Sequence, residues 1–130
     1  IKNDLKVIFD RDVKMITDGI SEIIDMIQMT TFGPDMQSPP QILLLSPPAL
    51  VHEGYLDVNN ELIFKGGKEK SMQFHDHYVK LANKKNCHYF DLSSAVKYSQ
   101  IDGLHLDEKG HKKTGELIAS KIQDIFRLDE

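Results

Sequence analysis

The residues best suited to chemistry in this sequence are an aspartate and a histidine three positions apart, Asp102 and His105. They belong to the segment Asp102-Gly103-Leu104-His105, which precedes the last amphipathic stretch of the chain. A loop that leads into a helix can place a carboxylate and an imidazole at this spacing side by side. Asp102 would then fix the tautomer of His105, and His105 would serve as general base for a nucleophile. The alternative is an Asx turn beside a surface histidine.

A second candidate lies near the start of the chain, in the pair Asn3-Asp4. A side-chain amide near the end of a strand can donate a hydrogen bond to a developing oxyanion. Asn3 would fill that role if the fold brought it to the histidine. The alternative is that Asn3 is an ordinary cap or turn residue.

The sequence gives little support for a metal site. His75 and His77 are two apart in a predicted helix, so they point to different faces and do not share a metal ion. The chain contains no H-E-x-x-H motif, no cysteine cluster and no phosphate-binding glycine loop. His52 and His88 have no evident partner in the sequence, and His111 is expected to be exposed in the first turns of the last predicted helix.

Composition is that of one ordinary globular domain, with a net charge of −4. No basic cluster is dense enough for nucleic acid, the nearest being Lys65, Lys68 and Lys70, which we interpret as a solvated loop. No apolar run approaches the length of a membrane span. The single cysteine, Cys87, is interpreted as a small core residue and fits a reducing compartment, so we expect a cytoplasmic location.

Hydrophobic periodicity predicts the elements that must position these residues. A helix is predicted over residues 12–29, and residues 30–40, which contain glycine and three prolines, are a loop. Residues 41–46 are predicted to form a strand buried on both faces. The predicted inner face of the helix comprises Val13, Ile16, Ile20, Ile23, Ile24 and Ile27, with Met15, Met26 and Met29 packing at its flanks.

The second half of the chain repeats this alternation. Residues 49–67 are irregular, with a small hairpin turning at Asn59-Asn60 between Leu56 and Phe64. A helix over 68–85 and a strand over 87–91 follow, and Asp107 can cap a last helix that ends near Phe126. The expected buried residues of the two helices are Phe74, Tyr78, Leu81 and Ala82 in the first, and Leu117, Ile118, Ile122, Ile125 and Phe126 in the second.

Strands that alternate with helical crossovers predict an α/β fold, a parallel sheet covered on both faces. In such sheets the active site lies beyond the carboxyl ends of the strands, where both Pro47-Pro48 and residues 102–105 fall. The two predicted strands are too few for a sheet of this kind. Either further strands come from elsewhere, or the chain is part of a domain.

Several short segments of the sequence are informative when they are taken together in their order along the chain. They are NDLK (residues 3–6), LLLSPP (43–48), FKGGKEKS (64–71), FD (90–91) and DGLH (102–105), the last followed by a Gly-His pair. The ordered set resembles the SGNH (GDSL-type) hydrolases, particularly their arylesterase-like branch, and the likeness runs nearly end to end. The DGLH segment is its most specific part.

The resemblance implies a flavodoxin-like three-layer α/β/α fold with a parallel sheet, and a serine ester hydrolase without metal or organic cofactor. It implies His105 as general base, Asp102 as its orienting acid and Asn3 as an oxyanion-hole donor. The family's nucleophile lies in a Gly-Asp-Ser turn, which this chain lacks, and Ile1 stands where the family has a glycine. The resemblance therefore predicts that residues 1–130 are the C-terminal portion of one SGNH-hydrolase-like domain, with the nucleophile outside this chain.

Three hypotheses follow. The first is an esterase whose small-molecule substrates are small or short-acyl esters. Its assembly into homo-oligomers is expected from the resemblance alone. The second is a non-catalytic α/β module that binds a ligand or pairs with a chain carrying the missing strands. The third is a metal-dependent hydrolase that uses Asp102, His105 and Asp107.

Overall fold

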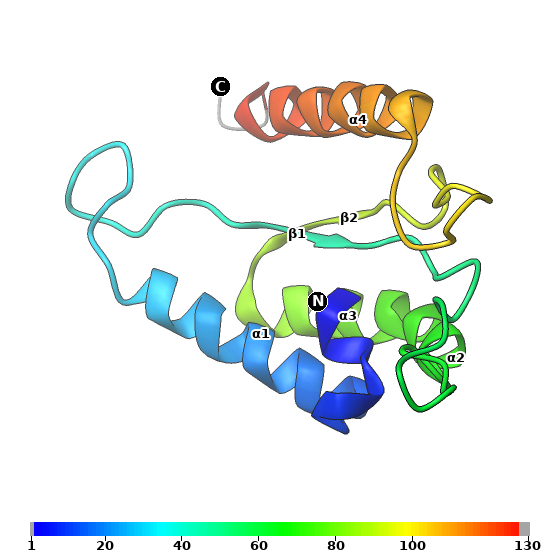
Figure 1. Ribbon diagram of the computed structural model, residues 1–130. Helices are drawn as coiled ribbons and strands as arrows, with labels where there is room; N and C mark the ends of the chain where they lie inside the picture. Colours follow the sequence, from blue (N-terminus) through cyan, green and yellow to red (C-terminus); the bar gives the residue numbers. More distant parts are fainter. Residues whose placement is uncertain (1, 128–130) are drawn as a thin grey trace.

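A short parallel ribbon of two strands lies between helices in this protein, whose computed structural model describes residues 2–127 (Figure 1). β1 (Leu43–Ser46) and β2 (His88–Asp91) form the ribbon. α1 (Val13–Gln28) and α3 (Phe74–Lys85) cover one side, and α4 (Glu108–Arg127) lies on the other. The expected three-layer α/β/α arrangement around a parallel sheet is thereby confirmed.

The helix predicted over residues 12–29 forms as α1. Asp12 caps it by accepting a hydrogen bond from the backbone N–H of Met15 at 2.7 Å. Its inner face packs on α3, but one of the residues expected there, Ile23, is 57 % exposed. The three methionines expected to pack at its flanks, Met15, Met26 and Met29, are also exposed. Periodicity therefore predicted the position of the apolar face correctly but assigned too many residues to it, because α3 covers only one flank of the helix.

The single helix predicted over 68–85 is divided into α2 (Gly67–Met72) and α3. The N–H of Gln73 bonds to the carbonyl of Lys70, three residues back, so one tight turn separates the two helices. The residues expected to face inward, Phe74, Tyr78, Leu81 and Ala82, are buried in the core, where they join Ile16 and Leu44. This layer carries most of the hydrophobic core.

The register of the ribbon runs from Leu43 opposite His88 to Ser46 opposite Asp91. Leu44 and Ser46 are buried, and Leu43 and Leu45 on the other face are half-buried. Parallel pairing brings the carboxyl ends of both strands to the same edge, so the loops that follow β1 and β2 leave the ribbon together. These two loops carry residues 47–66 and 92–107.

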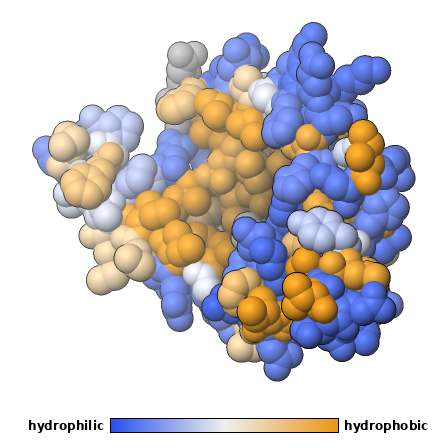
Figure 2. All heavy atoms as spheres, viewed as in Figure 1, coloured by the Kyte–Doolittle hydropathy of each residue, from blue (hydrophilic) through white to orange (hydrophobic). Residues whose placement is uncertain are grey.

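The α4 layer is less covered than expected. Of the five residues predicted to be buried, only Ile125 is, whereas Phe126 is 60 % exposed. Figure 2 shows apolar side chains gathered in a hollow between α4 and α1, over the strands. A pocket of about 220 Å³ lies there, lined by Ile42, Leu43, Ile122, Ile125 and Phe126 with two polar neighbours. A two-stranded ribbon is too narrow to cover the apolar face of a 20-residue helix.

The segment between β1 and α2 is irregular, as expected. Its hairpin is reduced to one antiparallel bridge between Leu56 and Leu62. The carboxylate of Asp57 stabilises the turn by accepting hydrogen bonds from the N–H groups of Asn59 and Glu61 at 2.8 and 3.0 Å. At the start of the chain, a 3-10 helix (Lys2–Leu5) buries Leu5 against the core and fixes the segment that contains Asn3.

Candidate active site

The loop before α4 brings Asp102 and His105 into contact. Nδ1 of the His105 ring lies 2.7 Å from Oδ2 of Asp102. The other carboxylate oxygen accepts hydrogen bonds from the backbone N–H groups of Leu104 and His105 at 2.9 and 3.0 Å. The Asx turn considered as an alternative is therefore present together with the imidazole contact. One carboxylate shapes the turn and orients the ring.

These contacts set the ionisation of the aspartate. The hydrogen bonds from the N–H of Leu104, from the His105 ring and from the His105 N–H lower the pKa of Asp102 to about 2. Asp102 is thus an acceptor at any physiological pH, which favours the tautomer of neutral His105 that carries its proton on Nδ1. Nε2 then has its lone pair free, and it makes no hydrogen bond to the described residues.

The backbone of this loop is held from two sides. The N–H of Ser99 bonds to the carbonyl of His105, and the N–H of Val51 bonds to the carbonyl of Gly103. Gly103 has φ +69°, and a Cβ atom on it would lie 2.4 Å from the backbone nitrogen of His52. Only glycine fits that position, so the close approach of the two strand-end loops depends on it.

Asn3 and His105 line the same pocket, although they are far apart in the sequence. The pocket has a volume of about 220 Å³. Its wall is completed by Lys2, Lys6, Tyr55, Ile63, Phe64 and Leu104. A hydrogen bond from Nζ of Lys2 to the carbonyl of Leu104, at 3.2 Å, ties the first helical turn to the loop before α4. The structure thus brings together the three residues singled out in the sequence.

No serine lines this pocket within residues 2–127. Asn3 and His105 are both exposed. An imidazole with a free Nε2 can accept a proton, and an amide can donate to an oxyanion, but the wall formed by residues 2–127 contains no serine hydroxyl or cysteine thiol beside them. The arrangement therefore provides an imidazole that is oriented by a carboxylate and can accept a proton.

Asp107, named in the metal hypothesis, has another role. Its Oδ1 accepts a hydrogen bond from the N–H of Gly110 at 2.7 Å, so the side chain caps α4. In the part of the chain that the structure describes, no three His, Cys, Asp or Glu side chains are grouped to hold a metal ion.

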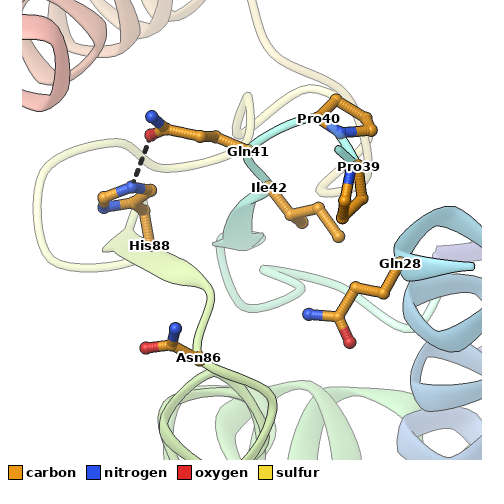
Figure 3. Close-up of a pocket in the computed structure, with 7 residues that line it drawn as sticks. All are labelled: Gln28, Pro39, Pro40, Gln41, Ile42, Asn86 and His88. Carbon is orange, nitrogen blue, oxygen red and sulfur yellow. Dashed lines mark hydrogen bonds between the residues drawn. The ribbon is translucent and has the colours of Figure 1, made fainter. Parts of the chain in front are cut away.

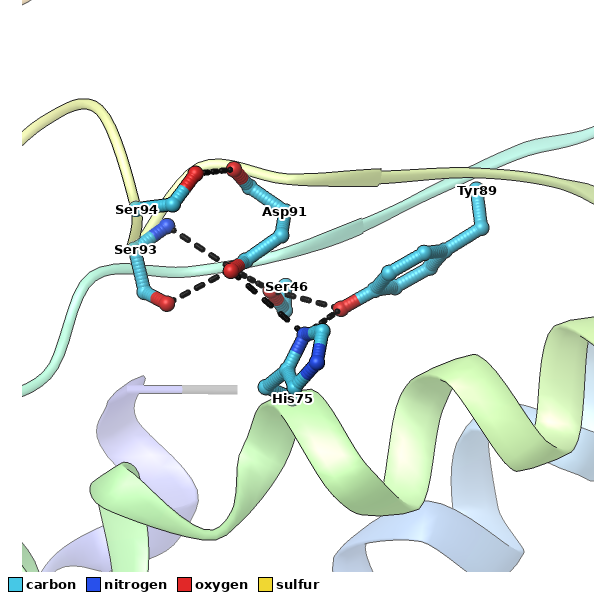
Figure 4. Close-up of polar contacts among 6 residues, drawn as sticks. All are labelled: Ser46, His75, Tyr89, Asp91, Ser93 and Ser94. Carbon is cyan, nitrogen blue, oxygen red and sulfur yellow. Dashed lines mark hydrogen bonds and ion pairs between the residues drawn. The ribbon is translucent and has the colours of Figure 1, made fainter.

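Sequence analysis missed a second polar cluster at the carboxyl ends of the strands (Figure 4). Ser46 at the end of β1 donates to Oδ1 of Asp91 at the end of β2, at 2.6 Å. Tyr89 donates to Oγ of Ser46 at 3.0 Å, and Nδ1 of His75 lies 2.9 Å from the Tyr89 hydroxyl and 3.4 Å from Oδ2 of Asp91. A signal for it exists in hindsight, because both predicted strands end in a polar residue.

This cluster contains Ser, His and Asp but does not have the order of a catalytic triad. The serine donates to the aspartate and not to His75, and Ser46 is fully buried. Burial opposes ionisation of Asp91, yet hydrogen bonds from Ser46 and Ser93 outweigh it and lower the pKa of the carboxyl. Asp91 therefore works as a charged anchor for the loop that begins at Ser93.

Other pockets lie away from this chemistry. One of about 320 Å³ is bordered by Gln28, Pro39, Pro40, Ile42 and Asn86, together with Gln41 and His88 (Figure 3). Nε2 of His88 lies 2.9 Å from the amide oxygen of Gln41. This pocket is at the amino ends of both strands, opposite to the end where parallel sheets bind substrates. His52 likewise bonds to the carbonyl of Gln100 at 3.0 Å.

None of the helices in the described part of the chain is both long and apolar enough to cross a membrane. The sequence matches no protein-family model and no curated protein.

Solved structures of esterases are similar to this chain. The aryl esterase of M. smegmatis matches with a TM-score of 0.81 and 27% identity, over 95% of this chain and 57% of the esterase. A carbohydrate acetylesterase from Sinorhizobium meliloti matches with a TM-score of 0.82 and 28% identity, over the same shares. The resemblance to SGNH-type hydrolases is thereby confirmed, and the chain spans little more than half the length of these esterases.

Proposed function

Given its likeness to SGNH-type esterases, we propose that this chain is the C-terminal portion of a serine ester hydrolase and supplies the general base of its active site. The observation that carries the proposal is the 2.7 Å contact between Asp102 and His105, in a pocket that Asn3 also lines. The matching structures are an aryl esterase and a carbohydrate acetylesterase, which supports hydrolysis of small or short-acyl esters. The nucleophilic serine would lie outside this chain.

In the proposed reaction, Nε2 of His105 takes the proton of the serine hydroxyl as its oxygen attacks the ester carbonyl. Asp102 keeps the ring in the required tautomer and stabilises the imidazolium that forms. The side-chain amide of Asn3 donates to the oxyanion of the tetrahedral intermediate. His105 then passes its proton to the leaving alcohol, and water releases the acyl group by the same steps in reverse.

The test is the intact mass of the protein, isolated from its natural source, before and after a fluorophosphonate probe that labels activated serines. A mass above that of residues 1–130 with one probe added, and no label in the His105→Ala variant, would support the proposal. Labelling that persists in His105→Ala would contradict the role of His105. The Ser94→Ala variant is the matched control, because Ser94 is an exposed serine outside the pocket.

One observation favours a second candidate, a non-catalytic module on the same scaffold. No serine of the described chain lines the pocket of His105, so acyl transfer through a serine needs a residue from outside this wall, whereas binding of a ligand does not. A protein whose mass matches these residues and which takes up no probe would support this candidate. The same result would refute the esterase.

A further inference from the structure

Two lysines share the pocket of His105. Lys2 lies in the first helical turn and Lys6 follows directly after it, and both line the pocket. Neither forms an ion pair with a carboxylate of residues 2–127. Partial burial and the nearby charge of Lys6 lower the pKa of Lys2, while Asp102 raises it. The pocket thus holds two ammonium groups, neither of which is in an ion pair among residues 2–127, and Asp102 is the carboxylate whose charge acts on Lys2.

Each ammonium has a neutral neighbour at the pocket wall. Nζ of Lys2 donates to the carbonyl of Leu104, the residue before His105, and an ammonium has two further donors. Nζ of Lys6 lies 6.0 Å from the centre of the Phe64 ring, at the outer limit of a cation–π contact. Donors and positive charge therefore remain available beside the candidate general base.

The carboxylates nearest to these lysines have other partners. Asp102 accepts from the Asx turn and the His105 ring, and Asp4 pairs with Arg11 at 3.0 Å. Asp57, in the adjoining pocket that shares Lys6, accepts from two backbone N–H groups. Glu61 borders the same adjoining pocket without pairing with Lys6. No acidic side chain lines the pocket of His105 itself.

The rest of the wall is apolar or aromatic, formed by Tyr55, Ile63, Phe64 and Leu104. Positive charge beside an apolar wall favours a ligand with an anionic group on a short apolar segment. The ammonium groups attract the anion, and the wall removes the apolar segment from water. We propose that the pocket takes an ester bearing a carboxylate, such as a half-ester of a short dicarboxylic acid. The carboxylate contacts Lys2 and Lys6, and the ester carbonyl faces Asn3 and His105. This assignment rests on the proposed function and names its substrate class.

Binding can be measured on the protein as it is isolated, with the serine that takes the fluorophosphonate probe, where there is one, replaced by alanine so that the ester is not consumed. The backbone N–H signals of Leu104 and His105 are followed by NMR at low salt during titration with monomethyl glutarate or its uncharged counterpart, dimethyl glutarate. We expect saturable shifts with the half-ester and an affinity about tenfold higher than for the diester, since the charged contact is partly desolvated. Raising the salt concentration should weaken binding of the half-ester alone.

Substitutions locate the anion. Lys6→Gln should weaken binding of the half-ester by roughly threefold to tenfold, because one charged hydrogen bond is lost. Lys2→Gln should weaken binding to a similar extent. Lys6→Gln leaves the contact between Lys2 and Leu104 intact, so weaker binding in Lys6→Gln reports the loss of a charge and not a loss of loop structure. Lys84→Gln is the control, because Lys84 is an exposed lysine of α3 outside the pocket.

Equal affinity for the half-ester and the diester, no saturable shift with either, or an unchanged affinity in Lys6→Gln would overturn the proposal. These failures are distinct from failure of the esterase assignment. A serine label that depends on His105, without preference for the anion, would remove only the substrate class. Anion binding at Lys2 and Lys6 without any serine label in the isolated protein would leave the site and remove the catalysis.

Discussion

Replacing Gly103 with alanine tests whether the loop before α4 depends on a close backbone approach. Two separate penalties follow from the structure. The φ of +69° is one that a residue with a side chain adopts at a cost of about 1–2 kcal/mol. The new Cβ would also lie 2.4 Å from the backbone nitrogen of His52, and relieving such overpacking costs about 1–3 kcal/mol.

We therefore expect Gly103→Ala to lower the free energy of unfolding by about 2–5 kcal/mol, a large part of the total for a domain of this size. The measurement is urea unfolding of the protein with and without the substitution. The slope of the free energy of unfolding against urea concentration should be the same in both proteins. The contact between Asp102 and His105 should weaken as well, because the carbonyl of Gly103 is the acceptor that fixes this loop to Val51.

Gly66→Ala is the matched control. Gly66 has a similar φ of +74°, but its added Cβ would meet nothing within 4 Å. This variant should carry only the conformational penalty, about 1 kcal/mol. The difference between the two variants isolates the contact with His52. Losses that agree within about 0.5 kcal/mol would refute the reasoning, because the close approach would then contribute nothing.

Two other predictions follow from buried polar groups. The Tyr78 hydroxyl is buried without a hydrogen-bond partner among residues 2–127. Tyr78→Phe should therefore leave the free energy of unfolding unchanged or raise it by about 1 kcal/mol, as measured by urea unfolding. A loss above about 1 kcal/mol would contradict this, because it would mean that the hydroxyl has a partner. The pKa of Asp91 lies below its ordinary 3.8, so its ionised form stabilises the fold above that pH, and this contribution is lost as the pH falls through the folded-state pKa. The stability advantage over Asp91→Asn should accordingly shrink during acid titration, and a constant difference down to about pH 2 would contradict it.

Local patterns predicted the elements well, because periodicity and capping act over a few residues. α1, both strands and α4 form where the sequence places them, within one or two residues at most boundaries. The contact between Asp102 and His105 was also predictable, since it joins residues three apart. Their assignment as base and acid remains a prediction.

Contacts between residues far apart in the sequence could not be predicted from local patterns. The Ser46–Asp91 bond depends on the parallel register, which no local pattern specifies. The exposure of Ile122 and Phe126 depends on how much sheet lies under α4, whereas periodicity reports only that an apolar face exists. Asn3 was placed at the site by the resemblance, and the structure supplies the reason, a shared pocket with His105.

The hydrogen bond between Lys2 and Leu104 has a consequence for the order of folding. It joins residues 102 apart, so it closes one of the longest loops the chain can form. Loop closure of that length carries an entropy penalty that local helices do not share, and contacts of large sequence separation slow folding. The pocket should accordingly assemble late, after α1 and α3 have docked. For the same reason its amide protons should exchange with solvent earlier than those of the core helices.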